Sequence, residues 1–200
     1  HIASSDPQAE LPTDGALSGG TMTFSITNRT AGSWTVTASD VTQAGIASNT
    51  STAITVNPAA ANKLVFTSSP VTVTAGVASG MITVQRQDQY GNAVTSESTR
   101  TVTLSSTSTG TVAFDPTSLS ITNGSSSASF TYTDTQAATP TITAASTSPS
   151  TITSTTQQET VSKAPPIFSG LTPSQSIIYG TTAIILAGKD VMGGAQTGTG

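Results

Sequence analysis

The sequence repeats itself at a distance of about 106 residues. Residues 24–26 (FSI) and 34–38 (WTVTA) recur as residues 130–132 (FTY) and 140–144 (PTITA). Upstream of these stretches, the pair Asp6-Pro7 matches Asp115-Pro116 with a slightly different offset, as an insertion in a loop would cause. A repeat of this length indicates that one folding unit is used more than once along the chain.

A second correspondence links the middle of the chain to its end. Phe66, Gly76, Ile82 and Val84 match Phe168, Gly180, Ile184 and Leu186. The sequence therefore predicts three modules, with the closing half of one in residues 1–57, a complete one in residues 58–163, and the opening part of another in residues 164–200. Prolines stand at both boundaries, where they stiffen a linker and interrupt strand pairing.

Each module alternates apolar residues with small hydroxyl residues. Thr and Ser together make up 71 of the 200 residues, and 34% of the chain is hydrophobic. Only 8% of the residues are charged, compared with about 25% in an ordinary soluble domain. Period-two alternation of this composition is typical of strands with one buried face and one hydroxyl-rich face in water.

The complete module contains seven to eight short strand signals and no helical period. Asp88–Asn92 predicts a tight turn with Gly91, and Asn92 beside it, at positive φ. Asn123-Gly124 predicts a hairpin between the flanking strands. This spacing predicts an all-β fold of tandem immunoglobulin-like antiparallel β-sandwiches. The expected inward side chains are Phe66, Ile82, Val84, Val102, Leu104, Val112, Leu119, Ile121, Phe130, Tyr132, Ile142 and Val161.

Three stretches resemble known bacterial repeats. Residues 84–94 (VQRQDQYGNAV) are similar to the strand-turn-strand of immunoglobulin-like repeats of the invasin and intimin type, with their Asp, Gly-Asn turn and Val. Residues 4–12 and 30–38 resemble repeats of very large bacterial surface proteins, and residues 173–181 resemble another bacterial immunoglobulin-like subtype. The resemblance implies an extracellular stalk, adhesin or surface-layer role and names no ligand.

The sequence offers no catalytic constellation. His1 is the single histidine and is terminal, so a Ser-His-Asp or Cys-His arrangement has no general base. The ten acidic residues are scattered singly, whereas a glycosidase needs two carboxyl groups about 5 to 10 Å apart. We expect no catalytic and no cofactor-binding residue, no cofactor and no enzyme activity.

Several residues could bind or react in other ways, and each also has a structural interpretation. Asp88, Asp115 and Asp134 could bind calcium at module ends, but turn aspartates bind their own backbone, and we expect no metal site. Trp34 could stack on a sugar or pack at a strand edge. Isopeptide bonds through Lys63, Lys163 or Lys189 would require a buried lysine. We expect the N-glycosylation patterns at Asn28, Asn49 and Asn123 to be unmodified.

Composition also limits the partners and the location. Six Lys and Arg residues without a cluster do not suit nucleic acid. No apolar run approaches about 18 residues, so we expect no membrane insertion. The chain has no Cys, little charge and much Thr and Ser, which fits an extracellular module of a bacterial cell surface. It opens at His1 without a signal peptide, and we expect it to be a piece of a longer polypeptide.

The leading hypothesis is a non-catalytic structural or adhesive repeat segment of a large bacterial surface or fibre-forming protein. The alternative is a spacer or carbohydrate-binding segment of a secreted polysaccharide-degrading enzyme. The expected partners are neighbouring modules of the same protein, with a cell-surface or glycan ligand also possible. Residues 1–57 and 164–200 together resemble one module, either because a long array is divided out of phase or because copies complete each other head to tail.

Overall fold

The computed structural model describes residues 1–43, 45–149 and 151–165, and every regular element in these ranges is a β-strand. The all-β fold predicted from the sequence is therefore confirmed. Contacts divide the chain into a unit of residues 1–164 and a second unit that begins at Pro165. The predictions for Phe168, Gly180, Ile184, Leu186 and Lys189 lie outside the described residues.

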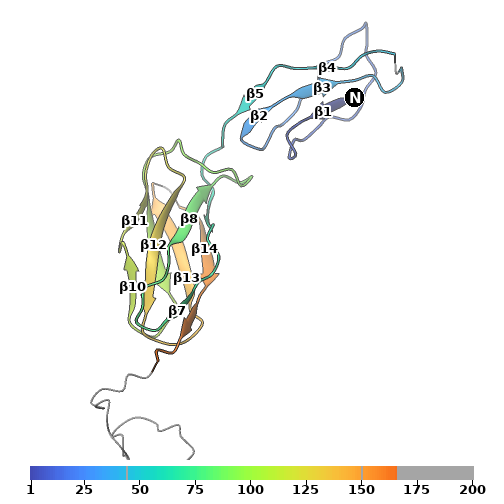
Figure 1. Cartoon of the computed structure of the whole chain (residues 1–200). Helices are drawn as coiled ribbons and strands as arrows, with labels where there is room; N and C mark the ends of the chain where they lie inside the picture. The colour runs from blue at the N-terminus through green and yellow to red at the C-terminus, as the bar shows by residue number, and fades with distance from the viewer. Residues whose placement is uncertain (44, 150, 166–200) are drawn as a thin grey trace, which may run out of the picture. The chain divides into compact units, whose positions relative to one another are not determined.

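Residues 58–163 form a sandwich (Figure 1). It is built from one eight-stranded sheet, in the order β10-β12-β8-β6-β14-β13-β9-β11, and from a two-stranded sheet of β15 and β7. The first four strands of the long sheet make one layer of the sandwich and the last four make the other. The strands are β6 (Lys63–Phe66), β7 (Thr72–Thr74), β8 (Ile82–Gln87), β9 (Arg100–Ser106), β10 (Val112–Asp115), β11 (Leu119–Ile121), β12 (Ser127–Asp134), β13 (Thr141–Ser148), β14 (Ile152–Gln158) and β15 (Thr160–Ser162).

Two strand pairs depart from the fully antiparallel sandwich that the sequence predicts. β6 pairs with β14 in parallel at Thr153 and Lys63, which joins the two layers along one edge. β7 pairs with β15 in parallel, with Val73 opposite Val161. In both pairs a strand from the start of the module runs beside one from its end. Alternation along single strands carries no information about such long-range pairing, so the sequence could not reveal it.

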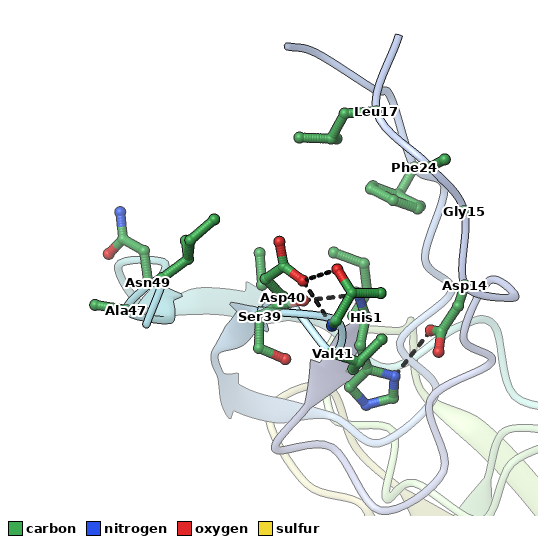
Figure 2. A pocket seen from close by; sticks show the side chains of 15 residues that line it. His1, Asp14, Gly15, Leu17, Phe24, Ser39, Asp40, Val41, Ala47 and Asn49 are labelled. Carbon is green, nitrogen blue, oxygen red and sulfur yellow. Dashed lines mark hydrogen bonds and ion pairs between the residues drawn. The ribbon is translucent and has the colours of Figure 1, made fainter. Parts of the chain in front are cut away.

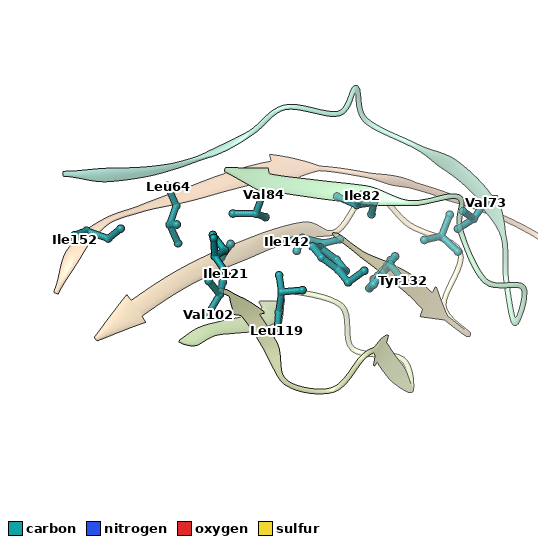
Figure 3. Close-up of a cluster of buried hydrophobic side chains, with 13 residues drawn as sticks. Leu64, Val73, Ile82, Val84, Val102, Leu119, Ile121, Tyr132, Ile142 and Ile152 are labelled. Carbon is teal, nitrogen blue, oxygen red and sulfur yellow. The ribbon is translucent and has the colours of Figure 1, made fainter. Parts of the chain in front are cut away.

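The core lies between the two layers and consists of alternating residues from both (Figure 3). Nine of the twelve expected inward side chains are buried, and Phe66, Leu104 and Val112 are partly buried against them. Leu64, Val73, Ala144 and Ile152 complete this cluster, although the sequence did not single them out. Three pairs of aromatic rings pack against each other at this core, among them Phe114 and Phe130, whose ring centroids are 5.8 Å apart.

The hairpin predicted at Asn123-Gly124 is wrong, although the turn itself exists. Gly124 has a φ of 86°, as the dipeptide suggests. β11 before it pairs with β9, however, and β12 after it pairs with β8 and β10 in the opposite layer. The chain crosses from one layer of the sandwich to the other at this turn. Leu119 and Ile121 on β11 therefore reach the core from one side, and Phe130 and Tyr132 on β12 reach it from the other.

Residues 1–57 contain five short strands, which are β1 (Ile2–Ser4), β2 (Gly32–Trp34), β3 (Val36–Ala38), β4 (Asn49–Thr50) and β5 (Ile54–Val56). Their pairing reproduces that of the closing half of residues 58–163. Thr37 lies opposite Thr50, and the residues 106 positions further along, Thr143 and Thr156, lie opposite each other in β13 and β14. The bridge of Gly32 to Val56 likewise corresponds to that of Ala138 to Val161.

The strand register corrects one detail of the sequence alignment. β1 pairs with β3 as β9 pairs with β13, which makes Ile2 the counterpart of Leu104 and Ser4 that of Ser106. Asp6 therefore follows the counterpart of β9, whereas Asp115 ends β10. The match of Asp6-Pro7 to Asp115-Pro116 is wrong because Asp and Pro are common in turns wherever a strand ends.

Candidate functional site

Residues 1–57 contain a cavity of about 700 Å³. Its walls come from β1, from the segment 14–24 and from residues 38–49 after β3 (Figure 2). Most of the lining side chains are apolar, among them Ile2, Leu17, Phe24, Val41 and Ile46. A cavity with this lining suits an apolar segment rather than a charged ligand.

The polar rim of the cavity contains His1, Asp14 and Asp40. The Nδ1 atom of His1 lies 2.9 Å from Oδ1 of Asp14, and both side chains are about half exposed. Asp40 accepts hydrogen bonds from the Thr42 hydroxyl and from the Thr42 and Gln43 amides, and these bonds lower the pKa of Asp40. Asp40 therefore stabilises its own turn.

Nothing in the sequence pattern indicated that His1 contacts Asp14, which lies 13 residues away. In a catalytic triad such a pair needs a nucleophilic hydroxyl on the second ring nitrogen of the histidine. Among the described residues, the imidazole contacts the side chain of Asp14 through Nδ1. The arrangement provides a polar contact at the rim and no assembled nucleophile.

A buried arginine closes one end of the complete module. Arg86 on β8 is fully buried, and its guanidinium donates to six backbone carbonyls in two loops. Four of these carbonyls belong to residues 94–98 and two to residues 122–125. Burial lowers the pKa of Arg86. The side chain is used to bind backbone carbonyls, two of which, those of Thr95 and Thr122, also accept a hydrogen bond from a backbone amide.

Asp88 plays the same role in the turn that follows β8. Its carboxylate accepts hydrogen bonds from the amides of Ala59, Tyr90 and Asn92 and from the side chain of Asn92, at 2.8 to 3.0 Å. Burial on its own raises the pKa of Asp88, but these hydrogen bonds outweigh it and lower the pKa. Gly91 has a φ of 93° as predicted, whereas the expectation of positive φ at Asn92 is wrong. The side chain of Asn92 also bonds the backbone of Arg29 and Ala31.

Two further acids anchor the opposite end of the module. The Tyr132 hydroxyl donates to Asp134 at 2.6 Å, and the Gln136 amide donates to the same carboxylate at 2.9 Å. Burial, together with this contact, raises the pKa of Tyr132 to about 12. Glu159 is buried and accepts hydrogen bonds from the Val71 amide and the Gln157 side chain. Val71 immediately precedes β7, so Glu159 attaches the start of β7 to the end of the module.

The three candidate calcium ligands do not converge. Asp88 and Asp134 are buried, and their carboxylate oxygens accept hydrogen bonds from N–H and O–H donors, while Asp115 is exposed at the end of β10. No group of three or more His, Cys, Asp or Glu side chains among the described residues could hold a metal ion. The interpretation of Asp88 as a turn residue that binds its own backbone agrees with these contacts, and Asp134 binds the backbone in the same way although the sequence did not indicate it.

The remaining candidates lie apart from one another. Trp34 is half-buried on the edge strand β2, where its Nε1 donates to the carbonyl of Thr30 at 2.6 Å and its ring lies over Gly32. Lys63 is half-buried on β6 and Lys163 is exposed, so neither is the buried lysine that an isopeptide bond would require.

Within the part of the chain that the structure describes, no long apolar helix of membrane-spanning type occurs.

Sequence reasoning missed the buried charges, although a signal for three of them was present. The alternation that places Ile82 and Val84 inside continues through Arg86 to Asp88, and the burial follows the same period. The alternation along β8 alone could therefore have predicted that Arg86 and Asp88 are buried. For Asp134 the same argument applies along β12, after Phe130 and Tyr132.

No protein-family model matches this sequence, and no curated protein does. Among solved structures, domains 1–6 of the surface layer protein SbsC are 22% identical, with a TM-score of 0.39, over 83% of this chain and 20% of that one. The Yersinia pseudotuberculosis adhesin InvE is 15% identical, with a TM-score of 0.38, over 80% and 48%.

A glycosyl hydrolase family 2 member from Bacteroides cellulosilyticus is 14% identical, with a TM-score of 0.43, over 70% of this chain and 19% of that one. The chain thus spans less than half the length of these three structures. At such identities and TM-scores, we take no activity, ligand or partner from any of them.

Proposed function

We propose that this chain is a load-bearing, non-catalytic repeat segment of an extracellular bacterial surface protein. The observation that carries the proposal is the parallel pairing of β7 with β15. β7 lies near the start of the complete module and β15 at its end. A pull on the two ends therefore drives these parallel strands in opposite directions along their length and loads the hydrogen bonds between them together, in shear.

The contacts around this pair support the same function. The Ala75 amide donates to the Ser162 carbonyl at 2.8 Å, and the Thr160 amide donates to the Val71 carbonyl at 3.0 Å. Glu159 adds a side-chain bond to the Val71 amide. Val73 and Val161, opposite each other in the pair, are both buried in the core, which shields the neighbouring hydrogen bonds from water.

The use of the buried charges also favours a structural role. Arg86, Asp88, Asp134 and Glu159 all bind backbone groups. Catalytic groups, in contrast, are aimed at a cleft where a substrate can reach them.

A surface location is consistent with a chain that has no Cys and only 8% charged residues.

Single-molecule pulling of the 200-residue chain by its ends tests the proposal. We expect one dominant unfolding event that releases about 100 residues, the size of the complete module. Ala75→Pro removes the N–H that bonds Ser162 and should lower the unfolding force clearly. Thr111→Pro, which removes one N–H bond to the Thr135 hydroxyl outside the β7–β15 pair, is the matched control and should lower it much less. Equal effects of the two substitutions would contradict the load-bearing role.

A further inference from the structure

The turn that follows β8 contacts a loop of residues 1–57. The side chain of Asn92 accepts a hydrogen bond from the Ala31 amide at 2.8 Å and donates one to the Arg29 carbonyl at 2.7 Å. A side-chain amide carries both donors and an acceptor, so it can bind a backbone carbonyl and a backbone N–H at the same time. Asn92 therefore binds this loop in the way that the backbone of a neighbouring strand would.

An aromatic ring in the same turn adds a second contact. The guanidinium carbon of Arg29 lies 5.7 Å from the centre of the Tyr90 ring, within the range of a cation–π interaction. Arg29 also forms an ion pair with Glu10, so two partners restrict the position of its side chain. Tyr90 and Asn92 thus bind the same loop, one through a side chain and the other through the backbone.

Both partners of this contact are held in place by a buried aspartate. On one side, the Asp6 carboxylate accepts hydrogen bonds from the Arg29 amide at 2.7 Å and from the next amide along the chain at 3.1 Å. On the other side, the Asp88 carboxylate accepts hydrogen bonds from the amide and the side chain of Asn92, at 2.9 and 2.8 Å. The loop and the turn therefore meet as preorganised surfaces, which lowers the entropic cost of their contact.

The linker between the two segments is also bonded to the complete module. The Ala59 amide donates to the Asp88 carboxylate at 3.0 Å, and the Ala61 amide donates to the Glu97 carboxylate at 2.6 Å. Segments joined by a linker move relative to each other by default, unless contacts hold them. Because Asp88 binds both the linker and Asn92, the linker and the docking contact belong to one hydrogen-bonded network.

We propose that the turn of residues 88–92 is a docking element that binds residues 29–31 and makes the connection between residues 1–57 and the complete module a rigid joint. It requires from its partner a backbone carbonyl, a backbone N–H two residues further on, and a cation that reaches the aromatic ring. These contacts lie outside the β7–β15 pair. The joint therefore goes beyond the load-bearing proposal, and either can fail without the other.

The distance between two spin labels on the 200-residue chain tests the joint. The chain has no Cys, so introduced cysteines at exposed strand positions give unique attachment points. Thr55→Cys with Ser120→Cys is the joint pair, and Ser120→Cys with Gln158→Cys, within the complete module, is the reference pair. Pulsed electron paramagnetic resonance measures both distance distributions. We expect the joint pair to be as narrow as the reference pair, and a joint pair several-fold broader in the otherwise unmodified chain would overturn the proposal.

Substitutions in the turn test which contacts hold the joint. Asn92→Leu keeps the size of the side chain and removes both bonds to residues 29–31, so we expect it to broaden the joint pair several-fold. Gln89→Ala, at an exposed position in the same turn, is the matched control and should leave the width unchanged. Tyr90→Phe keeps the ring and should keep the narrow distribution, whereas Tyr90→Ala should broaden it. A joint pair that stays narrow in Asn92→Leu would overturn the proposal.

The reference pair separates a loss of docking from a loss of folding. Asn92→Leu also removes a bond to Asp88 within the turn, so the reference pair must stay narrow in this variant. Ala31→Pro is the second variant, because it removes the amide that donates to Asn92 and leaves the turn itself intact. We expect Ala31→Pro to broaden the joint pair and to leave the reference pair narrow. If the joint pair also stays narrow in Ala31→Pro, the proposal is wrong.

Discussion

The Nε atom of Arg86 donates to the carbonyl oxygen of Val94, eight residues further along the chain, at 2.7 Å inside the sandwich. This bond is one of six that the guanidinium makes to the backbone of two loops. Arg86 thus ties together the two loops at this end of the module, because the planar guanidinium carries five N–H donors that can reach several carbonyls at once.

Replacing Arg86 by Met should therefore destabilise the module by about 3 to 5 kcal/mol, because several buried carbonyls lose their partner and Met supplies no donor. Urea denaturation of the chain measures this change. Gln85→Met, on the opposite face of β8, is the control and should change the free energy of unfolding by less than about 1 kcal/mol. A loss below about 1 kcal/mol for Arg86→Met would show that water replaces the guanidinium.

Gly91 should not tolerate a β-branched residue. Its φ of 93° lies in the left-handed region, which L side chains adopt only with strain. We expect Gly91→Val to destabilise the module by about 1 to 3 kcal/mol. Gly80→Ala is the control, because a Cβ there meets nothing within 4 Å and its φ lies outside that region. An unchanged melting temperature for Gly91→Val would contradict the turn.

Gly110 is restricted for a different reason, which is space. A Cβ at this position would lie 2.6 Å from Oδ1 of Asp134 and 2.8 Å from the backbone nitrogen of Gln136. We expect Gly110→Ala to cost about 1 to 3 kcal/mol through overpacking and to disturb the Tyr132–Asp134 hydrogen bond. Thermal denaturation measures the cost. Wild-type stability would mean that the loop moves aside freely.

Acid should affect residues 1–57 through Asp6. Burial raises the pKa of Asp6, but hydrogen bonds from Thr30, Gln8 and Arg29 outweigh it and lower the pKa from 3.8 to about 2. The ionised carboxylate therefore stabilises the folded form above pH 4, and this stabilisation is lost as the pH falls from about 4 to about 2.

Trp34 is the only tryptophan and lies in the same segment, so its fluorescence reports this transition. Asp6→Asn should remove most of the pH dependence between pH 4 and pH 2. Asp14→Asn, at a half-exposed position, should leave it in place. A pH profile that is the same in Asp6→Asn and the unmodified chain would assign the transition to another group.

The sequence predicted the parts of the fold that depend on local alternation. The inward residues of β8, β9, β12 and β13 follow period two, and the offset of 106 residues reappears in the strand pairing. The parallel pairs β6–β14 and β7–β15 were not predictable, because they join segments about 90 residues apart whose contacts leave no local pattern.

The cavity in residues 1–57 also lay beyond sequence reasoning. The segment around Phe24 has the alternation of a strand, like its counterpart around Phe130, yet among the described residues it forms isolated bridges of Thr21 to Ser18 and of Thr27 to Glu10. Strand formation depends on a partner as well as on the pattern. Neither residue type nor spacing indicated the contact of His1 with Asp14.

The load-bearing role is tested most directly by changing the direction of force on one module. The chain has no Cys, so pairs of introduced cysteines give unique attachment points. Ala60→Cys with Lys163→Cys applies the force across both ends and shears the β7–β15 pair. Val77→Cys with Lys163→Cys applies it at one end of the pair and peels the hydrogen bonds apart singly. We predict an unfolding force several-fold higher for the first pair than for the second, and equal forces would contradict the account.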